Sequence, residues 1–371
     1  MRLIPIPVLF AILAAPAAAQ DTAQLDGLTW RLSGEVKVAP HRGRQALAFR
    51  SGTALLDAPA FENGTVEFDL ALRYVRAFTG VSFRREDGGS EQFYLRPHQW
   101  GRFDAMQYTP VEHGVAAWQL YPEYNAAFDT PFDRWFHVRL VVSGARLAVY
   151  LDGGADPVLV VDRLRRDPRA GGIQLFSSFP AGEPADLFPA AVANVRVTPD
   201  RALGAAAAPE PASSPGVIPS WALSPAVPDP GTPIRRLPTV AGAWTVADAD
   251  ELGRVNIARH RAIPAGAERG TVLARVVIRS DRAQRKKLGL GFSDEGSVFL
   301  NGELVFSANN TFLSRSGRYL GIMTVENDAL YLPLRAGENE LVIAVTEAFG
   351  GWGVVGRFED MDGITVEAAV R

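Results

Sequence analysis

The chain has 371 residues and no cysteine, which excludes disulfide bonds, thiolate nucleophiles, cysteine-ligated zinc and iron–sulfur clusters. It also lacks an excess of either charge, because 38 Lys and Arg residues face 41 Asp and Glu residues. Without a positive field to gather phosphate groups, we expect no nucleic-acid binding. Helical periodicity is nearly absent, although 47% of the residues are hydrophobic and suffice for real cores. The chain is therefore expected to fold mainly as strands.

Short catalytic and metal-binding motifs are missing as well. There is no Gly-x-Ser-x-Gly elbow, and the spacing of the five histidines indicates neither a catalytic triad nor a zinc site. Residues 351–356 match the dinucleotide fingerprint, but that fingerprint needs a helix to begin at the glycines, and the residues that follow read as a strand. We therefore expect no cofactor and no metal site.

Long apolar runs are also scarce. The first one, Leu3–Ala15, follows a positively charged start and precedes small residues, which is typical of a secretory signal peptide. It is shorter than the roughly 20 apolar residues of a membrane span, and prolines interrupt it. We expect residues 1–19 to be a signal peptide of a bacterial protein that is periplasmic or secreted and has no membrane span.

Proline and alanine dominate residues 200–238, and this composition favours an extended spacer. Trp221 and Leu223 within the spacer suggest that part of it packs against a domain. The sequence therefore predicts a first domain at 20–199, a linker at 200–238 and a second domain at 239–371.

Both predicted domains show the period-two alternation of half-buried strands, punctuated by turn residues. In the first domain it predicts strands at 64–72, 80–85, 91–97, 135–144, 146–153 and 190–199. In the second it predicts strands at 271–280, 287–293, 296–308, 319–325, 329–334 and 339–348, with a hairpin turn at Asn301-Gly302. The expected fold class is all-β, with two β-sandwich (jelly-roll) domains joined by the Pro/Ala-rich linker.

Several segments carry family resemblances. GTVEFDLAL, WFHVRLVVSGARLAVYLDG and GGIQLFSS make the first domain resemble the concanavalin A-like lectin/glucanase superfamily, which includes laminin-G-like domains. FSDEGSVFLNGELVF and LRAGENELVIAVTEAFGGWG make the second resemble the galactose-binding-like jelly rolls that accompany glycoside hydrolases. Both resemblances imply carbohydrate as the partner. The first also allows a structural calcium ion, whose ligands the sequence cannot place.

One departure bears on catalysis. The laminarinase-type signature of this superfamily is Glu-x-Asp-x-x-Glu, but the matching strand here has Glu67, Asp69 and then Leu72 in place of the last acid. Because the retaining mechanism needs two carboxyl groups on one face, the missing acid argues against it. If the chain is an enzyme, a glycoside hydrolase or a polysaccharide lyase, then Glu67, His98 and Glu112 are the candidates for proton transfer.

The densest cluster of polar and aromatic residues lies between Arg84 and Tyr124, and its middle part reads as a long loop between Pro97 and Phe132. Rings cover the apolar faces of sugars while Arg and Gln bond their hydroxyls, and long loops tend to be functional. We expect the following residues to line a groove of the first domain: Tyr94, Arg96, His98, Gln107, Tyr108, Trp118, Gln119 and Tyr121. The alternative is that these residues pack a surface loop.

In the second domain, Trp352 in a glycine-rich loop is the candidate for stacking on a sugar ring, and buried packing is the alternative. The leading hypothesis is an exported protein that binds a polysaccharide or glycoconjugate without catalysis. A glycoside hydrolase or lyase that uses the same groove is the second hypothesis. A structural or adhesion protein with protein partners is the third.

Overall fold

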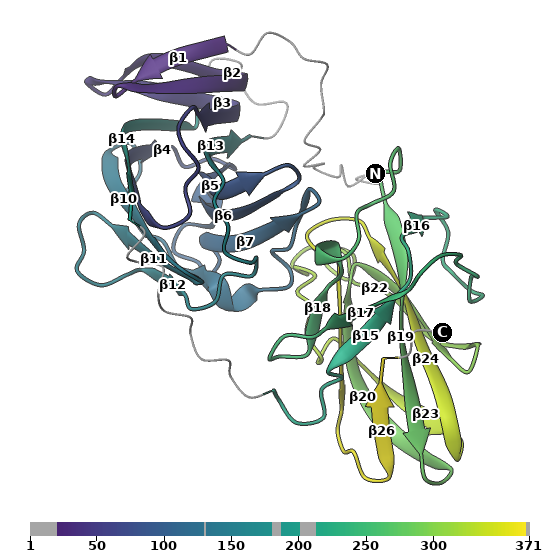
Figure 1. Cartoon of the computed structure of the whole chain (residues 1–371). Helices are drawn as coiled ribbons and strands as arrows, with labels where there is room; N and C mark the ends of the chain where they lie inside the picture. The colour runs from purple at the N-terminus through teal and green to yellow at the C-terminus, as the bar shows by residue number, and fades with distance from the viewer. Residues whose placement is uncertain (1–20, 130, 180–186, 201–212, 369–371) are drawn as a thin grey trace. The chain divides into compact units, whose positions relative to one another are not determined.

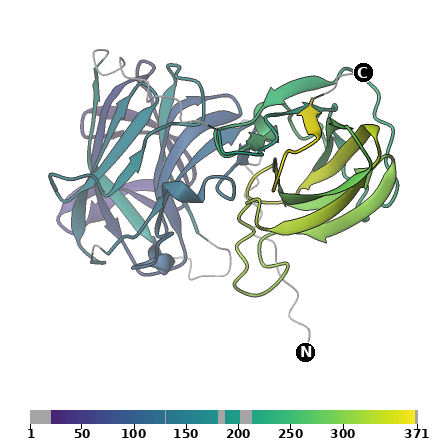
Figure 2. The same ribbon diagram turned by 90° about the horizontal axis from the view of Figure 1, so that it is seen from below.

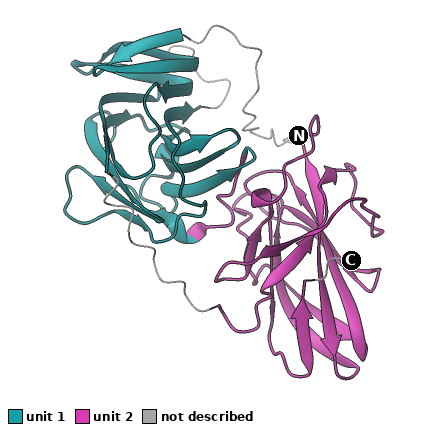
Figure 3. Ribbon diagram, in the orientation of Figure 1, with its two compact units in different colours: residues 1–114, 123–209 teal, residues 115–122, 210–371 magenta. Residues whose placement is uncertain are grey.

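The computed structural model describes residues 21–129, 131–179, 187–200 and 213–368 (Figure 1). The predicted all-β fold class is confirmed, since strands make up 55% of the structure and helix 3%. The chain divides into two compact units: unit 1 contains residues 1–114 and 123–209, and unit 2 contains residues 115–122 and 210–371 (Figure 3). The expected signal peptide lies outside the described residues.

Unit 1 is built on a curled antiparallel sheet (Figure 1, Figure 2). Its strand order is β12-β11-β10-β4-β14-β3-β13-β5-β6-β7, with β2 paired to β3, β1 to β2 and β9 to β7. The strands are β1 (Asp21–Leu25), β2 (Leu28–His41), β3 (Arg44–Leu56), β4 (Gly64–Leu72), β5 (Phe78–Glu86), β6 (Gly89–Leu95), β7 (Met106–Glu112), β9 (Asn125–Ala126), β10 (Trp135–Ser143), β11 (Arg146–Leu151), β12 (Leu159–Val161), β13 (Gly172–Ser178) and β14 (Ala190–Pro199).

Strand β4 shows how the alternation of residues builds the core of unit 1. Val66, Phe68 and Leu70 are fully buried, whereas Glu67 and Asp69 between them are only partly covered. Successive side chains of a strand point to opposite faces, so one face of β4 enters the core and the other stays accessible. We call the accessible face the outward face.

Unit 2 is a sandwich of two antiparallel sheets (Figure 2). One sheet has the order β17-β15-β19-β24-β21-β22, with β16 and β26 paired to β19, and the other has the order β18-β25-β20-β23. The strands of these sheets are β15 (Ser220–Leu223), β16 (Val227–Pro228), β17 (Thr245–Asp248), β18 (Arg254–Asn256), β19 (Gly270–Ser280), β20 (Gln284–Ser293), β21 (Glu295–Leu300), β22 (Glu303–Asn309), β23 (Asp328–Leu334), β24 (Gly337–Glu347), β25 (Gly353–Phe358) and β26 (Ile364–Glu367). The two-residue strand β8 (Val115–Ala116) belongs to neither sheet.

The predicted hairpin turn at Asn301-Gly302 joins β21 to β22. Both residues have positive φ, 53° and 84°, as a two-residue type I′ turn requires. The predicted strand at 319–325 is wrong, because these residues are irregular. Met323 donates its backbone N–H to the carbonyl of Gln119 rather than to a strand ladder.

Short 3-10 helices form η1 (Pro97–Gln99), η2 (Pro122–Tyr124) and η4 (Ile257–Arg259). Within the described residues, no helix has the length and apolar character needed to cross a membrane.

Part of the segment that we assign to the linker is built into unit 2. Residues 201–212 lie outside the described residues, but β15 (Ser220–Leu223) pairs with β17 and β19. Trp221 on β15 is fully buried in the core between the two sheets. Further along, Ile234 and Leu237 pack against the outer side of the β19-β24-β21 sheet.

We predict that Trp221→Ala lowers the unfolding free energy of unit 2 by about 3–5 kcal/mol, because it removes a large core side chain and leaves a cavity. Urea unfolding followed by far-UV circular dichroism measures the change. Leu252→Ala, at a position 45% exposed, is the control and should change stability by less than about 0.5 kcal/mol. Equal stability of the Trp221 variant and the wild type would contradict the prediction.

Candidate functional site

Most of the side chains expected to line a groove in the first domain lie inside unit 1. The Tyr94 hydroxyl donates to Gln107 Oε1 at 2.7 Å, and both side chains are buried. The buried Arg96 guanidinium contacts the Asp104 carboxylate at 2.6 Å. Strands β6 and β7 are covered on both faces, so these buried polar groups form their hydrogen bonds with one another. Their interior position corrects the expectation of an open groove at these residues.

Tyr108 and Glu112 belong to a network of charged groups within the fold. The fully buried Tyr108 donates its hydroxyl to the Glu91 carboxylate at 2.5 Å. Burial raises the pKa of Glu91 to about 7, against the opposing effects of the Tyr108 hydrogen bond and the Arg166 charge. Glu112, a candidate for proton transfer, pairs with Arg166 at 3.2 Å. Both residues therefore have structural partners.

His98 lies on η1 with its ring 5.3 Å from that of Phe78. Burial, and to a smaller extent the charges of Arg96 and Arg76, lower the pKa of His98 to about 4, while Asp104 opposes them. At neutral pH the imidazole is therefore uncharged and has no proton to give as a general acid.

Trp118, Gln119 and Tyr121 belong to unit 2 rather than to the first domain. Gln119 is fully buried, and its backbone N–H donates to the carbonyl of Gly350 at 2.9 Å. Its Oε1 accepts a hydrogen bond from the Ser293 hydroxyl at 2.8 Å. This hydrogen bonding makes the segment 115–122 part of the framework of unit 2, which corrects its expected place in a groove of the first domain.

The remaining aromatic candidates also have neighbours within unit 2. The ring of the buried Tyr121 lies 4.7 Å from the Arg254 guanidinium. Trp118 is partly exposed and makes an edge contact with Phe349. Trp352 is fully buried and donates its indole N–H to the carbonyl of Val345 at 3.1 Å, so it is not free to stack on a sugar.

A cluster of polar side chains surrounds Asp69 on the outward face of β4. This cluster lies at an accessible surface. One Asp69 oxygen accepts from Arg44 at 2.5 Å and from Asn194 at 2.7 Å, and the other lies 2.8 Å from His137 Nδ1. Burial alone would raise the pKa of Asp69, but the hydrogen bonds from His137 and Asn194 and the Arg44 charge lower it below its ordinary value. Asp69 is therefore an ionised, fixed acceptor.

A β-bulge brings Asn194 to this cluster. The register of β14 against β4 shifts between Ala193, which lies opposite Asp69, and Arg196, which lies opposite Glu67. Asn194 sits in the shift with a positive φ of 56°. Bulges re-aim side chains, and here the amide is turned towards the neighbouring carboxylate.

Glu67 lies two residues before Asp69 on the same face and is held less firmly. Because the ionised Asp69 can only accept, His137 donates through Nδ1, and its Nε2 lies 3.5 Å from a Glu67 oxygen. The Glu67 side chain is 25% exposed and that of His137 is 37% exposed. The imidazole thus stands between two carboxylates that reach solvent.

Trp135 adds an aromatic surface beside these polar groups. Trp135 is on β10, opposite Ala71 on β4, and it packs on four buried alanines: Ala46, Ala71, Ala191 and Ala193. The Arg44 guanidinium lies 5.0 Å from the indole ring, and His41 contacts the ring edge-on at 5.5 Å. Arg44 therefore touches both the indole and the Asp69 carboxylate, which joins ring and cluster into one surface.

A second row of polar side chains crosses the same face. Arg139 on β10 lies opposite Glu67 on β4 and opposite Tyr150 on β11. Its guanidinium stacks 4.1 Å from the Tyr150 ring, and both side chains are partly exposed. We call the surface made by Arg44, Glu67, Asp69, Trp135, His137, Arg139, Tyr150 and Asn194 the outward polar face.

Of this face, only Glu67 and Asp69 stand out in the sequence alone. The alternation Trp135-x-His137-x-Arg139 is a signal that places three more members on one side of a strand. The register that puts this strand beside β4, and the bulge at Asn194, depend on contacts between distant segments. Among the described residues, no group of three or more His, Asp or Glu side chains is placed to hold a metal ion.

No protein-family model and no curated protein matches the chain. Among solved structures, the carbohydrate-binding module CBM66 from Bacillus subtilis is 16% identical, with a TM-score of 0.33, covering 45% of this chain and 92% of that one. The Bacillus licheniformis β-glucanase is 14% identical, with a TM-score of 0.30 and coverages of 48% and 82%. A Bacillus subtilis protein of unknown function with a galectin-like fold is 12% identical, with a TM-score of 0.31 and coverages of 45% and 86%. Membership of the concanavalin A-like and galactose-binding-like families stays a prediction.

We predict that replacing His98 makes unit 1 less sensitive to acid. The unfolded chain binds a proton on His98 near the ordinary pKa of 6.5, whereas the folded chain binds it only near 4. Between these values the unfolded state holds more protons, so acidification favours unfolding through this residue. The difference in unfolding free energy between about pH 7 and pH 5 should therefore be smaller in His98→Gln than in the wild type.

Urea unfolding at the two pH values measures this difference. Gln99→Ala, on the same 3-10 helix, removes a side chain that does not titrate and should keep the wild-type difference. An unchanged pH response in His98→Gln would overturn the assignment.

Proposed function

We propose that unit 1 binds carbohydrate, a polysaccharide or glycoconjugate, on the outward polar face. The observation that carries the proposal is the partly exposed Trp135 indole on its alanine floor, next to the hydrogen-bonded cluster around Asp69. A flat ring covers the apolar C–H face of a sugar, while carboxylates, imidazole and guanidinium bond its hydroxyls. No catalysis is needed for this role.

The cluster is suited to recognition because its side chains hold one another in place. Arg44, His137 and Asn194 are all fixed by Asp69, so a ligand meets groups that have already lost their freedom. Ordering side chains on binding costs about 0.5–1.5 kcal/mol for each one, and this cost is largely avoided here. Because the ionised Asp69 is paired with Arg44, the ligand meets no isolated charge there.

The proposal includes export. Residues 1–19 carry the expected signal peptide, and extracellular or periplasmic glycans are the carbohydrates that an exported protein meets.

We predict that Trp135→Ala weakens polysaccharide binding at least tenfold, which corresponds to about 1.4 kcal/mol. Affinity gel electrophoresis and calorimetry with barley β-glucan, laminarin and pectic galactan identify the ligand and measure the loss. The physical reason is the loss of the ring that covers the sugar face.

Trp100→Ala is the matched control, since Trp100 is 46% exposed in unit 1 and takes no part in the outward polar face. It should leave binding unchanged. Circular dichroism verifies that both variants are folded. Wild-type affinity in a folded Trp135→Ala variant would refute the placement of the site.

A second function, glycoside hydrolysis, is favoured by the unequal engagement of the two carboxylates. Asp69 accepts from three side chains and stays ionised, whereas Glu67 meets only His137 Nε2 at a long 3.5 Å among the contacts in this cluster. Glu67 could then give a proton to a glycosidic oxygen while the ionised Asp69 stabilises the positive charge that develops on the sugar. His137 would position Glu67.

If the wild type releases reducing ends from a polysaccharide that it binds, we predict that Glu67→Gln lowers the rate at least a hundredfold, because proton transfer contributes roughly this much or more. The variant should still bind, since the amide keeps the shape of the side chain. Glu62→Gln, at an exposed position in unit 1, is the control. Absence of reducing-end release by the wild type would reject catalysis and leave the binding proposal intact.

A further inference from the structure

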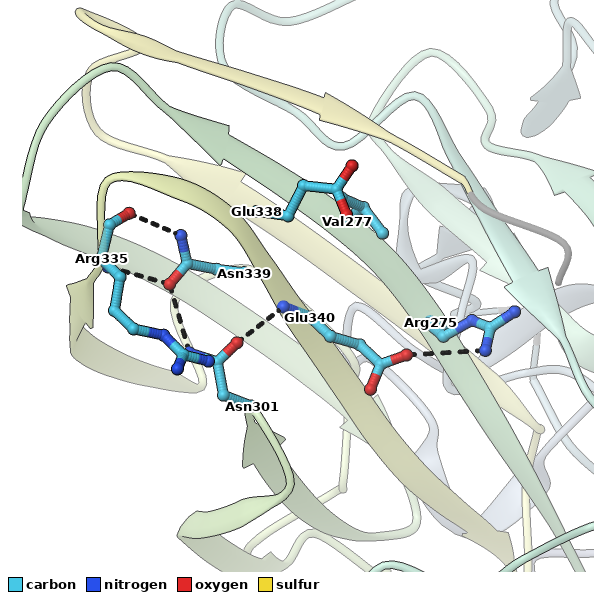
Figure 4. Close-up of a pocket in the computed structure, with 7 residues that line it drawn as sticks. All are labelled: Arg275, Val277, Asn301, Arg335, Glu338, Asn339 and Glu340. Atoms are coloured by element: carbon cyan, nitrogen blue, oxygen red, sulfur yellow. Dashed lines mark hydrogen bonds and ion pairs between the residues drawn. The ribbon is translucent and has the colours of Figure 1, made fainter.

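Unit 2 has a polar depression of about 320 Å³ on the outer side of its larger sheet. It lies where β19, β24 and the turn between β21 and β22 come together (Figure 4). Its lining residues are Arg275, Val277, Asn301, Arg335, Glu338, Asn339 and Glu340. Ligand sites span about 300–1,000 Å³, so this one holds a single small ligand rather than a length of polymer.

Buried hydrogen bonds build one wall of the depression. Asn339 is fully buried, and its Oδ1 accepts from the backbone N–H of Arg335 while its Nδ2 donates to the Arg335 carbonyl, both at 2.9 Å. The Asn301 amide donates to the same Asn339 oxygen at 3.2 Å, and Asn301 Oδ1 accepts from the N–H of Glu340 at 3.0 Å (Figure 4). This amide network fixes the backbone of Arg335 beside the depression.

The Arg335 side chain is the unpaired charge of this surface. Its exposed guanidinium makes no hydrogen bond or ion pair with any of the described residues. The two carboxylates of the lining are both engaged: Glu340 pairs with Arg275 at 3.5 Å, and Glu338 pairs with Arg279 at 2.7 Å. A guanidinium without a partner offers a pair of parallel donors that matches a carboxylate.

The opposite wall offers groups for hydroxyls. The Glu340 side chain is 42% exposed, so its oxygens can still accept while it pairs with Arg275. The Arg275 guanidinium also stacks 4.2 Å from the Trp244 ring, which holds it in place. Val277, buried on β19, lies opposite Glu340 in the register of β19 and β24 and adds an apolar surface to the lining.

We infer that this depression binds one acidic sugar residue, a hexuronate. The carboxylate of the sugar would meet Arg335, its hydroxyls would meet Glu340 and Asn301, and its apolar C–H face would lie on Val277. This site is separate from the carbohydrate face proposed for unit 1 and does not depend on it. A protein with both sites would bind the apolar face of a sugar ring on unit 1 and an acidic sugar residue on unit 2.

The test is a calorimetric titration of the full chain with galacturonate and glucuronate, beside galactose and glucose, at physiological ionic strength. We predict that at least one uronate binds, that neither neutral sugar binds with comparable affinity, and that Arg335→Ala weakens uronate binding at least tenfold. Arg335→Lys should recover only part of the affinity, because an ammonium keeps the charge and loses the bidentate geometry.

Arg318→Ala is the matched control, because Arg318 is another exposed arginine of unit 2 outside the depression. It should bind the uronate as the wild type does. Trp135→Ala should also leave uronate binding unchanged, which separates this site from the face of unit 1. The inference fails if Arg335→Ala binds normally, if acetate competes as well as the uronate, or if neither uronate binds.

Discussion

The hydrogen bonding of the Asp69 carboxylate ties the outward polar face of unit 1 together. Side chains from three other strands end on its two oxygens: Arg44 from β3, His137 from β10 and Asn194 from β14. A partly buried carboxylate loses hydration, and three charge-assisted or polar donors offset that loss. The same contacts fix the imidazole beside Glu67 and the guanidinium beside Trp135, so the positions of both groups depend on this one acceptor.

Local alternation was enough to predict much of the fold. The ranges 64–72 and 190–199 match β4 and β14, and the Asn301-Gly302 turn has the expected conformation, because period two and positive φ are properties of short segments. Strand β7 reads as part of a loop in the sequence, because both of its faces are buried and the alternation is lost. The segment 319–325 alternates but forms no strand, because its backbone groups bond to Gln119, Leu313 and Asn327 rather than to a neighbouring strand.

The candidate site was harder to predict, for a related reason. Alternation tells which side chains share a face but not whether that face is covered. Tyr94, Arg96 and Gln107 have the composition of a binding groove, yet they are interior, and their polar atoms bond one another. In the sequence, a buried tyrosine with a hydrogen-bond partner cannot be told from an exposed tyrosine that stacks on a sugar. Only the register between distant strands, which places His137 opposite Asp69, separates a covered face from an open one.

Both candidate sites also depend on an asparagine at positive φ. Asn194 at the bulge of β14 has φ 56°, and Asn301 at the β21–β22 turn has φ 53°. A regular ladder spaces side chains at fixed intervals, whereas a bulge or a turn directs a side chain away from those intervals. Asparagine tolerates this conformation and supplies both a donor and an acceptor. At Asn194 the amide completes the shell of a carboxylate, and at Asn301 it braces the buried Asn339 that fixes Arg335. These two irregular backbone positions therefore supply side chains that hold both candidate sites together.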